Sequence, residues 1–457
     1  MALMSDHRRN GVFLLQLCSL VILFAQRSIA DDRPNVLMIF TDDQGVNDVG
    51  CYGSEIPTPR IDQLATEGVR LTQFYAASSI CTPSRFGLFT GRYPHRSRDQ
   101  LLSALMFLTE EDAKRGIRQG EQTYVSLLQD AGYSTALVGK WHLGHGSEQF
   151  WPTRHGFDSF FGHTGGCVDF FTLHYGNRPD WYRGRDIVET EGYATDVITD
   201  EALSILRDHA MHEPVTRKPL YLHLSYNAPH FGKGWNEASG ATENVMQPKQ
   251  ADLEHVSQIK DPLRQSFAAK VVGLDDSIGR VLDELDRQGL ADNTIVIFMT
   301  DHGGDPDYGG SNLPLRGDKA TLFEGGLRVP CIVRWPQHIP AATQCDAVAC
   351  AIDWFPTLCE IAGVAFPNES LDGQSILQSL TSCSTDQPNR TLVWRTGSHA
   401  ELGRKSWYAI RQGDWKWVQP PEQSGMLFDL SHDPNEQHDV ADRHPDVASQ
   451  LEQAAKR

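Results

Sequence analysis

Acidic side chains directly follow two apolar segments of this 457-residue chain. Residues 35–40 lead into Asp42 and Asp43, and a second apolar segment leads into Asp301 and His302. Carboxylates gathered in one place repel each other unless a cation binds between them, and oxygen ligands favour Ca²⁺ first and Mg²⁺ second. One such pair alone is more simply a turn or a helix cap. Two pairs at equivalent positions favour a site for one metal ion.

Basic side chains stand at matching positions after other apolar segments or in glycine-containing runs. They are Lys140, His142, His230 and Lys319. A single lysine or histidine in a loop is usually a solvated side chain. Two lysines and two histidines beside a metal site describe a pocket for a tetrahedral oxyanion, with groups that can transfer protons.

Cys81 is the candidate nucleophile. It opens the run Cys81-Thr82-Pro83-Ser84-Arg85, in which the proline predicts the first turn of a helix. Cys81 would then lie at the helix N-terminus, where the dipole favours an anion. A cysteine-dependent phosphatase loop needs its arginine at position 87, which is Gly87, and the arginine of this chain is Arg85.

The apolar segments that precede these residues predict the strands of a sheet. Strands are expected over residues 35–40, 134–138, 220–224 and 294–299. Helices are expected from Thr58 through Ala65, over 123–130 and over about 264–287. Strands that alternate with helices predict an α/β fold with a large, mostly parallel sheet and helices on both faces. Ligands of such sheets bind beyond the carboxyl ends of the strands. Residues 231–262 are polar and show little hydrophobic periodicity. They are expected to form a long surface loop near the substrate.

The character of the sequence changes after about residue 380. Four short, aromatic-rich segments separated by turn signals predict a small antiparallel sheet, and residues 447–455 predict a closing helix. We therefore expect a catalytic α/β domain over residues 31–380 and a small C-terminal α+β subdomain over 381–457.

The N-terminus has the pattern of a signal peptide over residues 1–30. Arg8 and Arg9 precede an apolar run over residues 12–25, and the small residue Ala30 ends the segment. The run is short for a bilayer span of about 20 residues, although an uncleaved anchor helix is the alternative. We expect an exported protein (periplasmic, secreted or lysosome-like) with no stable membrane insertion after cleavage. The net charge of −18 argues against nucleic acid as a partner.

The nine cysteines fit an oxidising compartment. Apart from Cys81 and the one in the signal segment, their number is odd, so at least one is free. Cys345 with Cys350, or Cys359 with Cys383, are the candidate disulfide pairs.

The run Cys81–Arg85 resembles the core signature of the type I sulfatases, in which the cysteine is oxidised to formylglycine. Four further segments resemble family motifs in family order, over residues 33–43, 139–144, 300–303 and 309–330. The resemblance covers nearly the whole chain after residue 30, and is closest to the arylsulfatase and N-acetylgalactosamine-sulfatase branch. It implies an alkaline-phosphatase-like fold, hydrolysis of the sulfate monoester of a small molecule or carbohydrate, and a formylglycine-generating enzyme as maturation partner.

The resemblance also implies roles for the residues singled out above. The implied ligands of one Ca²⁺ ion are Asp42, Asp43, Cys81, Asp301 and His302. The implied catalytic residues are Cys81, Arg85, Lys140, His142, His230 and Lys319, of which Lys140, His230 and Lys319 would bind sulfate. Hydrated formylglycine would attack sulfur through one oxygen and later release sulfate as the aldehyde reforms. His302 stands where many members have asparagine, so the metal affinity is the least secure of these implications.

Two other functions compete with this interpretation. One is a phosphodiester or phosphonate monoester hydrolase of the same fold, because tetrahedral anions are chemically alike. The other is an inactive anion- or sugar-binding homologue, although every mechanistic position is filled. A dinuclear zinc phosphatase is disfavoured, because the ligands suffice for one metal. The aromatic residues of 157–175 and Trp181-Tyr182 would stack on sugar rings or belong to the core.

Overall fold

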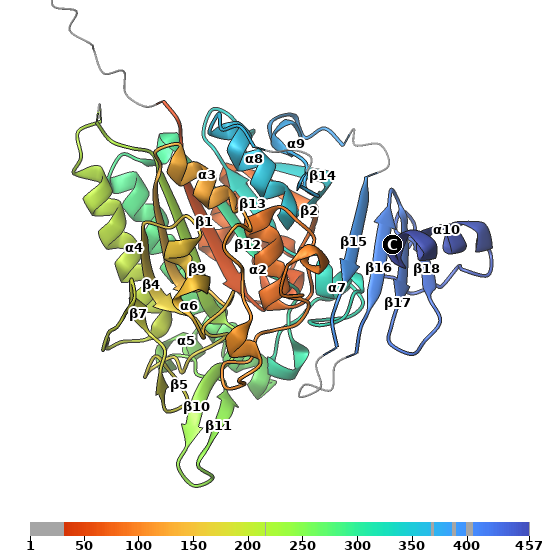
Figure 1. The fold of residues 1–457 in the computed structure, drawn as a ribbon, viewed down its shortest axis with the longest axis horizontal. Coiled ribbons are helices and arrows are strands. Elements are labelled where there is room, and N and C mark those ends of the chain that lie inside the picture. Colours follow the sequence, from red (N-terminus) through yellow and green to blue (C-terminus); the bar gives the residue numbers. More distant parts are fainter. Residues whose placement is uncertain (1–31, 215, 367–369, 386–389, 399–404, 457) are drawn as a thin grey trace, which may run out of the picture.

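The computed structural model describes residues 32–214, 216–366, 370–385, 390–398 and 405–456. A mixed ten-stranded sheet forms its centre, in the order β14-β2-β13-β12-β1-β9-β3-β4-β7-β8 (Figure 1). These strands are β1 Asn35–Asp42, β2 Val69–Tyr75, β3 Ser134–Lys140, β4 Ser159–His163, β7 Tyr182–Arg183, β8 Asp186–Ile187, β9 Leu220–Pro229, β12 Thr294–Thr300, β13 Cys331–Arg334 and β14 Thr343–Cys350. The helices are α1 Pro59–Glu67, α2 Cys81–Thr90, α3 Tyr124–Asp130, α4 Ala194–Ala210, α5 Gln250–Glu254, α6 Pro262–Arg287, α7 Glu324–Leu327, α8 Trp354–Ile361, α9 Leu377–Ser382 and α10 Pro445–Lys456.

The four predicted strands are the four neighbours β12, β1, β9 and β3 at the centre of the sheet. Each pair among them is parallel, so their carboxyl ends meet at one edge. Side chains of β1 alternate between two cores: Met38 packs with α2, α3 and α8 on one face, and Leu37 packs with α1, α4 and α6 on the other. Burial on both faces explains why these strands are continuously apolar. The predicted α/β class is confirmed.

Antiparallel strands flank this parallel centre. β13 runs antiparallel to β12 and β2, and β7 pairs antiparallel with β4 and β8. The connection from β12 to β13 spans residues 301–330 and carries Asp301, His302 and Lys319. Because β13 is antiparallel to β12, this connection begins and returns at the edge of the sheet where the central strands have their carboxyl ends, and α7 lies within it.

The predicted C-terminal sheet is present. It has four antiparallel strands, β15 Thr391–Arg395, β16 Tyr408–Gln412, β17 Trp415–Gln419 and β18 Met426–Asp429, and α10 packs against it. Figure 1 shows this sheet beside the α7 end of the large domain. The exact boundary at residue 380 stays a prediction.

Buried charges connect the two sheets. Lys416 Nζ on β17 lies 2.8 Å from Glu324 Oε1 of α7 and 3.0 Å from Glu436 Oε1. Glu436 Oε2 accepts the backbone N–H of Glu324 at 2.5 Å, and Tyr75 Oη donates to Glu324 Oε2 at 2.7 Å. The backbone carbonyl of Glu436 also accepts from Arg316. Arg316 and Glu324, which lie on either side of Lys319 in its loop, are therefore both held by the C-terminal region.

The expectation of a patternless loop over residues 231–262 is wrong. β10 Gly232–Asn236 and β11 Ala241–Val245 form an antiparallel hairpin there, followed by α5. Most of its side chains are polar and partly or fully exposed, so the strands lack the apolar alternation that would announce them. A separate two-stranded sheet, β5 His174–Tyr175 and β6 Arg178–Pro179, lies beside it.

All cysteines in the described part of the chain are free, so neither candidate disulfide pair is bridged. Cys345 and Cys350 lie on the same strand, β14. At about 3.3 Å per residue their Cα atoms are roughly 16 Å apart, far beyond the reach of a disulfide.

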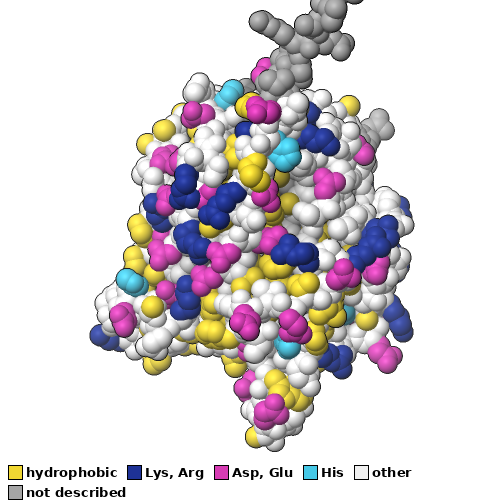
Figure 2. Space-filling view, turned by 90° about the vertical axis from the view of Figure 1, so that its left-hand side faces the viewer, with side chains coloured by type: hydrophobic (Ala, Val, Ile, Leu, Met, Phe, Trp, Pro, Cys, Tyr) yellow, Lys and Arg dark blue, Asp and Glu magenta, His cyan; other side chains and the backbone are white. Residues whose placement is uncertain are grey.

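The predicted signal peptide lies outside the described residues. Among the helices that are described, none has the length and apolarity needed to cross a bilayer. The face drawn in Figure 2 carries acidic and basic side chains interspersed with one another.

Candidate active site

The ends of β1 and β12 bring the predicted acidic residues together. Asp42 is the last residue of β1, and Asp43 turns the chain away with a φ of 63°. Asp301 and His302 follow the neighbouring parallel strand β12. The backbone N–H of Asp43 donates to Asp301 Oδ1 at 3.3 Å. A positive φ at a non-glycine residue costs energy, and such strain concentrates at functional sites.

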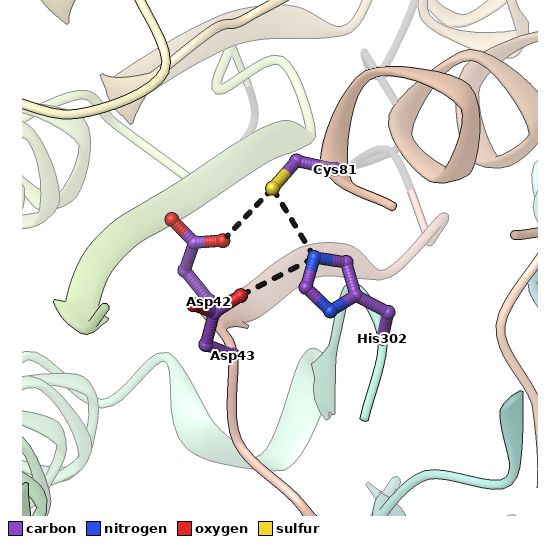
Figure 3. A group of neighbouring side chains, drawn as sticks. All are labelled: Asp42, Asp43, Cys81 and His302. Carbon is purple, nitrogen blue, oxygen red and sulfur yellow. Dashed lines mark hydrogen bonds and ion pairs between the residues drawn. The ribbon is translucent and has the colours of Figure 1, made fainter. Parts of the chain in front are cut away.

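Four buried residues offer donor atoms within 4.8 Å of one another: Asp42, Asp43, Cys81 and His302. Figure 3 shows Cys81 Sγ between Asp42 Oδ1, at 3.7 Å, and His302 Nε2, at 3.1 Å. His302 Nε2 also lies 3.3 Å from Asp43 Oδ1 and 3.6 Å from Asp301 Oδ1. The five implied ligands are thus neighbours in space.

Cys81 and Arg85 are placed by α2. Cys81 is the first residue of this helix, and every residue of the helix is buried. Arg85, one turn later, donates from Nη1 to Ser225 Oγ at 2.6 Å and to the Lys140 carbonyl at 3.2 Å. Its Nη2 lies 3.3 Å from Asp301 Oδ2. Arg85 therefore joins the helix to the ends of β3, β9 and β12. Ser225 was missed, although it directly follows the predicted strand 220–224.

The two lysines each pair with one aspartate. Lys140 Nζ lies 2.6 Å from Asp42 Oδ2, and Lys319 Nζ lies 2.6 and 2.7 Å from the two oxygens of Asp43. Lys319 also lies 3.9 Å from Asp305. Residues separated by up to 277 positions in the sequence thus place two ammonium groups at one cluster.

The two histidines lie on the same side of the cluster as the pocket. His142 has a φ of 58°, and its Nε2 lies 3.0 Å from the Leu105 carbonyl. His230 Nε2 lies 3.5 Å from Asp43 Oδ2. The buried Lys270 of α6 donates to the His230 carbonyl at 2.5 Å. Lys270 was missed, although a lysine within the apolar stripe of a helix is a signal that could have found it.

Two carboxyl groups of the acidic cluster and the imidazole beside them have raised pKa values. Burial and the neighbouring Asp42 hold the pKa of Asp301 well above its usual range, and burial raises the pKa of Asp43 to about 7. Burial opposes protonation of His302, but Asp301 and Cys81 overcome this and raise its pKa to about 10. The donor set therefore favours added positive charge, and its mainly carboxylate chemistry fits one hard divalent ion.

The basic groups divide into charged lysines and neutral histidines. Burial and the nearby Lys319 lower the pKa of His230 well below its usual range, and burial lowers the pKa of His142. Burial opposes the charge of Lys319, but Asp43 outweighs it and raises the pKa of this lysine. At neutral pH the lysines can bind an oxyanion, while these two imidazoles stay neutral.

A pocket of about 350 Å³ opens onto this cluster. Cys81, His142, His230 and Lys319 lie along its inner part, and its other lining residues include Phe107, Tyr175, Phe231 and Tyr308. Of the aromatic residues in 157–175 and 181–182, Tyr175 lines the pocket and Phe171 is exposed. Tyr182 is partly buried, and the remaining ones are core residues: Phe157, Phe160, Phe161, Phe170 and Trp181. The sequence alone could not separate these two roles, because both need large apolar rings.

Comparison with known proteins agrees with this geometry. The sulfatase family model matches residues 34–364, and the C-terminal model of N-sulphoglucosamine sulphohydrolase matches residues 317–457. Arylsulfatase J of Mus musculus is 32% identical over 470 residues, covering 92% of this chain and 74% of its own. N-acetylgalactosamine-6-sulfatase of Homo sapiens is 33% identical over 421 residues, covering 84% of this chain and 74% of its own.

The fold is equally similar to solved structures. The crystal structure of Ps i-CgsB in complex with k-i-k-neocarrahexaose superposes with a TM-score of 0.81 at 29% identity, covering 92% of this chain and 91% of that one. The matched regions contain the cysteine motif, both acidic strand ends and both lysines. The chain belongs to the sulfatase family and is a sulfuric ester hydrolase.

Proposed function

We propose that this protein hydrolyses sulfate monoesters of carbohydrates, with a formylglycine formed from Cys81 at a site for one Ca²⁺ ion. The observation that carries the proposal is the position of Cys81. It lies at the buried start of α2, within 4.8 Å of three candidate metal ligands and at the inner end of the pocket. An exported protein would meet a formylglycine-generating enzyme on its route, which supplies the maturation partner.

Arg85 and the two lysines would hold the reacting groups. Hydrated formylglycine supplies an oxygen nucleophile and, after transfer of the sulfuryl group, a second hydroxyl whose collapse to the aldehyde releases sulfate. Arg85 is fully buried and held by residues of β3, β9 and the connection after β12, so it can orient the modified side chain without reorganising. Lys140 and Lys319 face the same cluster and would bind sulfate oxygens.

Protons would move through His142, His230 and Lys319. His142 is neutral and lies with Cys81 along the pocket, which suits a base that assists breakdown of the sulfated side chain. His230 or Lys319 would protonate the leaving oxygen. His230 Nδ1 can donate to the Phe231 carbonyl at 2.8 Å, which leaves Nε2 toward the anionic cluster. A bound sulfate ester would add negative charge there and favour a proton on Nε2.

A Ca²⁺ ion would be held by Asp42, Asp43, Asp301, His302 and the modified Cys81. The ion would neutralise the carboxylates and polarise the bound ester. Exhaustive chelation should abolish activity, and added Ca²⁺ should restore it. Asp301→Ala should weaken Ca²⁺ binding in calorimetric titration and lose catalysis, whereas Asp186→Asn, at an exposed carboxylate of β8, should change neither. Full activity of metal-free protein would contradict the metal site.

Sulfate and phosphate esters distinguish the proposal from its competitor. A phosphate monoester carries nearly two negative charges at neutral pH, and hydrolases of such dianions commonly clamp them between two metals. The described residues contain one candidate metal cluster. We therefore expect kcat/KM for 4-nitrophenyl sulfate to exceed that for 4-nitrophenyl phosphate by orders of magnitude.

A phosphodiester is the sharper comparison, because it is a monoanion like the sulfate ester. Bis(4-nitrophenyl) phosphate and a phenylphosphonate monoester should be assayed together with the aryl sulfate and a panel of sulfated saccharides. Faster turnover of the diester or the phosphonate than of every sulfate ester would refute the proposed function.

A further inference from the structure

The hairpin β10–β11 forms part of the wall of the substrate pocket. Figure 1 shows it extending from the carboxyl ends of the central strands. Its Lys233 and Asn244 line the pocket. The Lys233 carbonyl accepts from Gly176 N at 2.8 Å, and Asn244 Nδ2 donates to Tyr308 Oη at 2.6 Å. The hairpin is therefore fixed to the rest of the pocket at two points.

Lys233 differs from the other lysine of this pocket in its partners. Lys319 pairs with Asp43 and also lies 3.9 Å from Asp305. Lys233 Nζ instead donates to the neutral amide of Asn244 at 2.7 Å and lies 5.7 Å from the centre of the Tyr175 ring. No carboxylate forms an ion pair with Lys233 in the part of the chain that the structure describes. A partly exposed cation without a carboxylate partner is available to an anionic ligand.

Neither carboxylate of the pocket, Asp305 or Asp307, forms an ion pair with Lys233. Asp305 is near Lys319, and its Oδ1 accepts the backbone N–H of Asp307 at 3.1 Å. Both acids belong to the connection after β12, whereas Lys233 belongs to the hairpin. The positive charge of Lys233 and the negative charges thus belong to different wall segments.

Aromatic rings line the same pocket and would orient a sugar. Phe231 and Tyr308 have ring centres 4.2 Å apart, and Phe107 and Tyr175 have ring centres 4.8 Å apart. Aromatic faces pack against the apolar faces of sugar rings. A saccharide held by its scissile sulfate at Cys81 would therefore present another substituent to Lys233.

We propose that Lys233 binds a second anionic group of the saccharide, a further sulfate or a carboxylate, and so makes the enzyme selective for multiply anionic carbohydrates. This inference rests on the proposed function, because the scissile sulfate fixes the saccharide in the pocket. Asn244 is a positioning residue that directs the Lys233 ammonium.

Matched pairs of saccharides test the proposal. Each pair differs by one anionic group: N-acetylglucosamine 6-O-sulfate against glucosamine 2-N,6-O-disulfate, monosulfated against disulfated neocarrabiose, and a disaccharide of N-acetylgalactosamine 6-sulfate with a neutral hexose against the same disaccharide with the corresponding uronate. The first two pairs add a sulfate, and the third adds a carboxylate. Affinity is measured as competitive inhibition of 4-nitrophenyl sulfate hydrolysis, together with direct turnover.

We expect at least one doubly anionic member to bind about ten- to a hundredfold more tightly than its partner, as for a hydrogen bond between charged groups. Lys233→Met should remove this difference, and Lys233→Arg should keep most of it. Both variants should hydrolyse 4-nitrophenyl sulfate, which has one anionic group, at the wild-type rate. Lys260→Met removes an exposed lysine that does not line the pocket and should behave as wild type.

The results separate this inference from the function on which it rests. If 4-nitrophenyl sulfate is hydrolysed but no pair shows a difference that depends on Lys233, the inference is wrong and the proposed function stands. An equal loss for the aryl sulfate and for every saccharide would also overturn it, because Lys233 would then act on the whole site. If no sulfate ester is hydrolysed, both fail.

Discussion

Cys81→Ala should lower kcat/KM for 4-nitrophenyl sulfate by about 10⁴-fold or more, the loss typical of removing a catalytic nucleophile. Cys81 Sγ lies between Asp42 and His302 at the inner end of the pocket, where a nucleophile would meet the ester. The substitution removes one buried atom from the start of α2, so the fold should persist, as thermal unfolding can verify. Cys51→Ser alters a partly buried thiol outside the pocket and is the matched control.

Cys81 itself is expected to be chemically modified in the active protein. A peptide that spans Cys81, taken from active protein, should contain an aldehyde in place of the thiol, measurable by mass spectrometry and by reaction with a hydrazide. An active preparation in which every copy of this peptide carries an unmodified thiol would disprove the formylglycine mechanism. Recombinant protein from a host without the modifying enzyme should be inactive and show the thiol.

Lys140→Ala and Lys319→Ala should each lower kcat/KM by about a hundredfold or more, as expected when a donor to developing negative charge is lost. Both ammonium groups face the acidic cluster, Lys140 through Asp42 and Lys319 through Asp43. The loss should appear in kcat as well as KM, because the charge on the transferred group and the leaving oxygen grows in the transition state.

The free energy of unfolding of Lys140→Ala and Lys319→Ala must be measured together with their activity. Each removes the lysine that pairs with a buried aspartate, and breaking a buried ion pair typically costs about 3–5 kcal/mol. The double variant Asp43→Asn/Lys319→Met removes both charges and should recover much of the stability without recovering activity. Lys114→Ala, at an exposed lysine, is the control. If Lys319→Ala is as active as the control while folded, Lys319 has no part in catalysis.

The centre of the fold could be predicted because its strands are buried on both faces. Continuous apolar segments identified β1, β3, β9 and β12, and the rule that ligands bind beyond their carboxyl ends gathered residues as distant as Asp42 and Lys319. These two rules alone bring the acidic and basic residues of the site to one edge of the sheet. The helix that carries Cys81 was found from Pro83.

Other features of the structure leave no recognisable pattern in the local sequence. The hairpin β10–β11 is polar and exposed, and its pairing is a property of the backbone, so Lys233 was placed in a loop of no particular structure. Ser225 and Lys270 act through contacts with Arg85 and the His230 carbonyl, which join segments far apart in the chain. The candidate disulfide Cys345–Cys350 failed because both residues belong to one strand, β14, which the expected strands did not include.

The buried charges that join the two sheets also constrain how relatives of this protein can be recombined. Lys416 faces two carboxylates at once, one from each side of the junction, and Glu436 supplies both a carboxylate and a carbonyl to the loop that carries Lys319. A chimera that takes its C-terminal module from another family member must therefore import Lys416 and Glu436 as a unit, or replace Glu324 as well. Otherwise Glu324 remains buried without its lysine, five residues along the chain from Lys319.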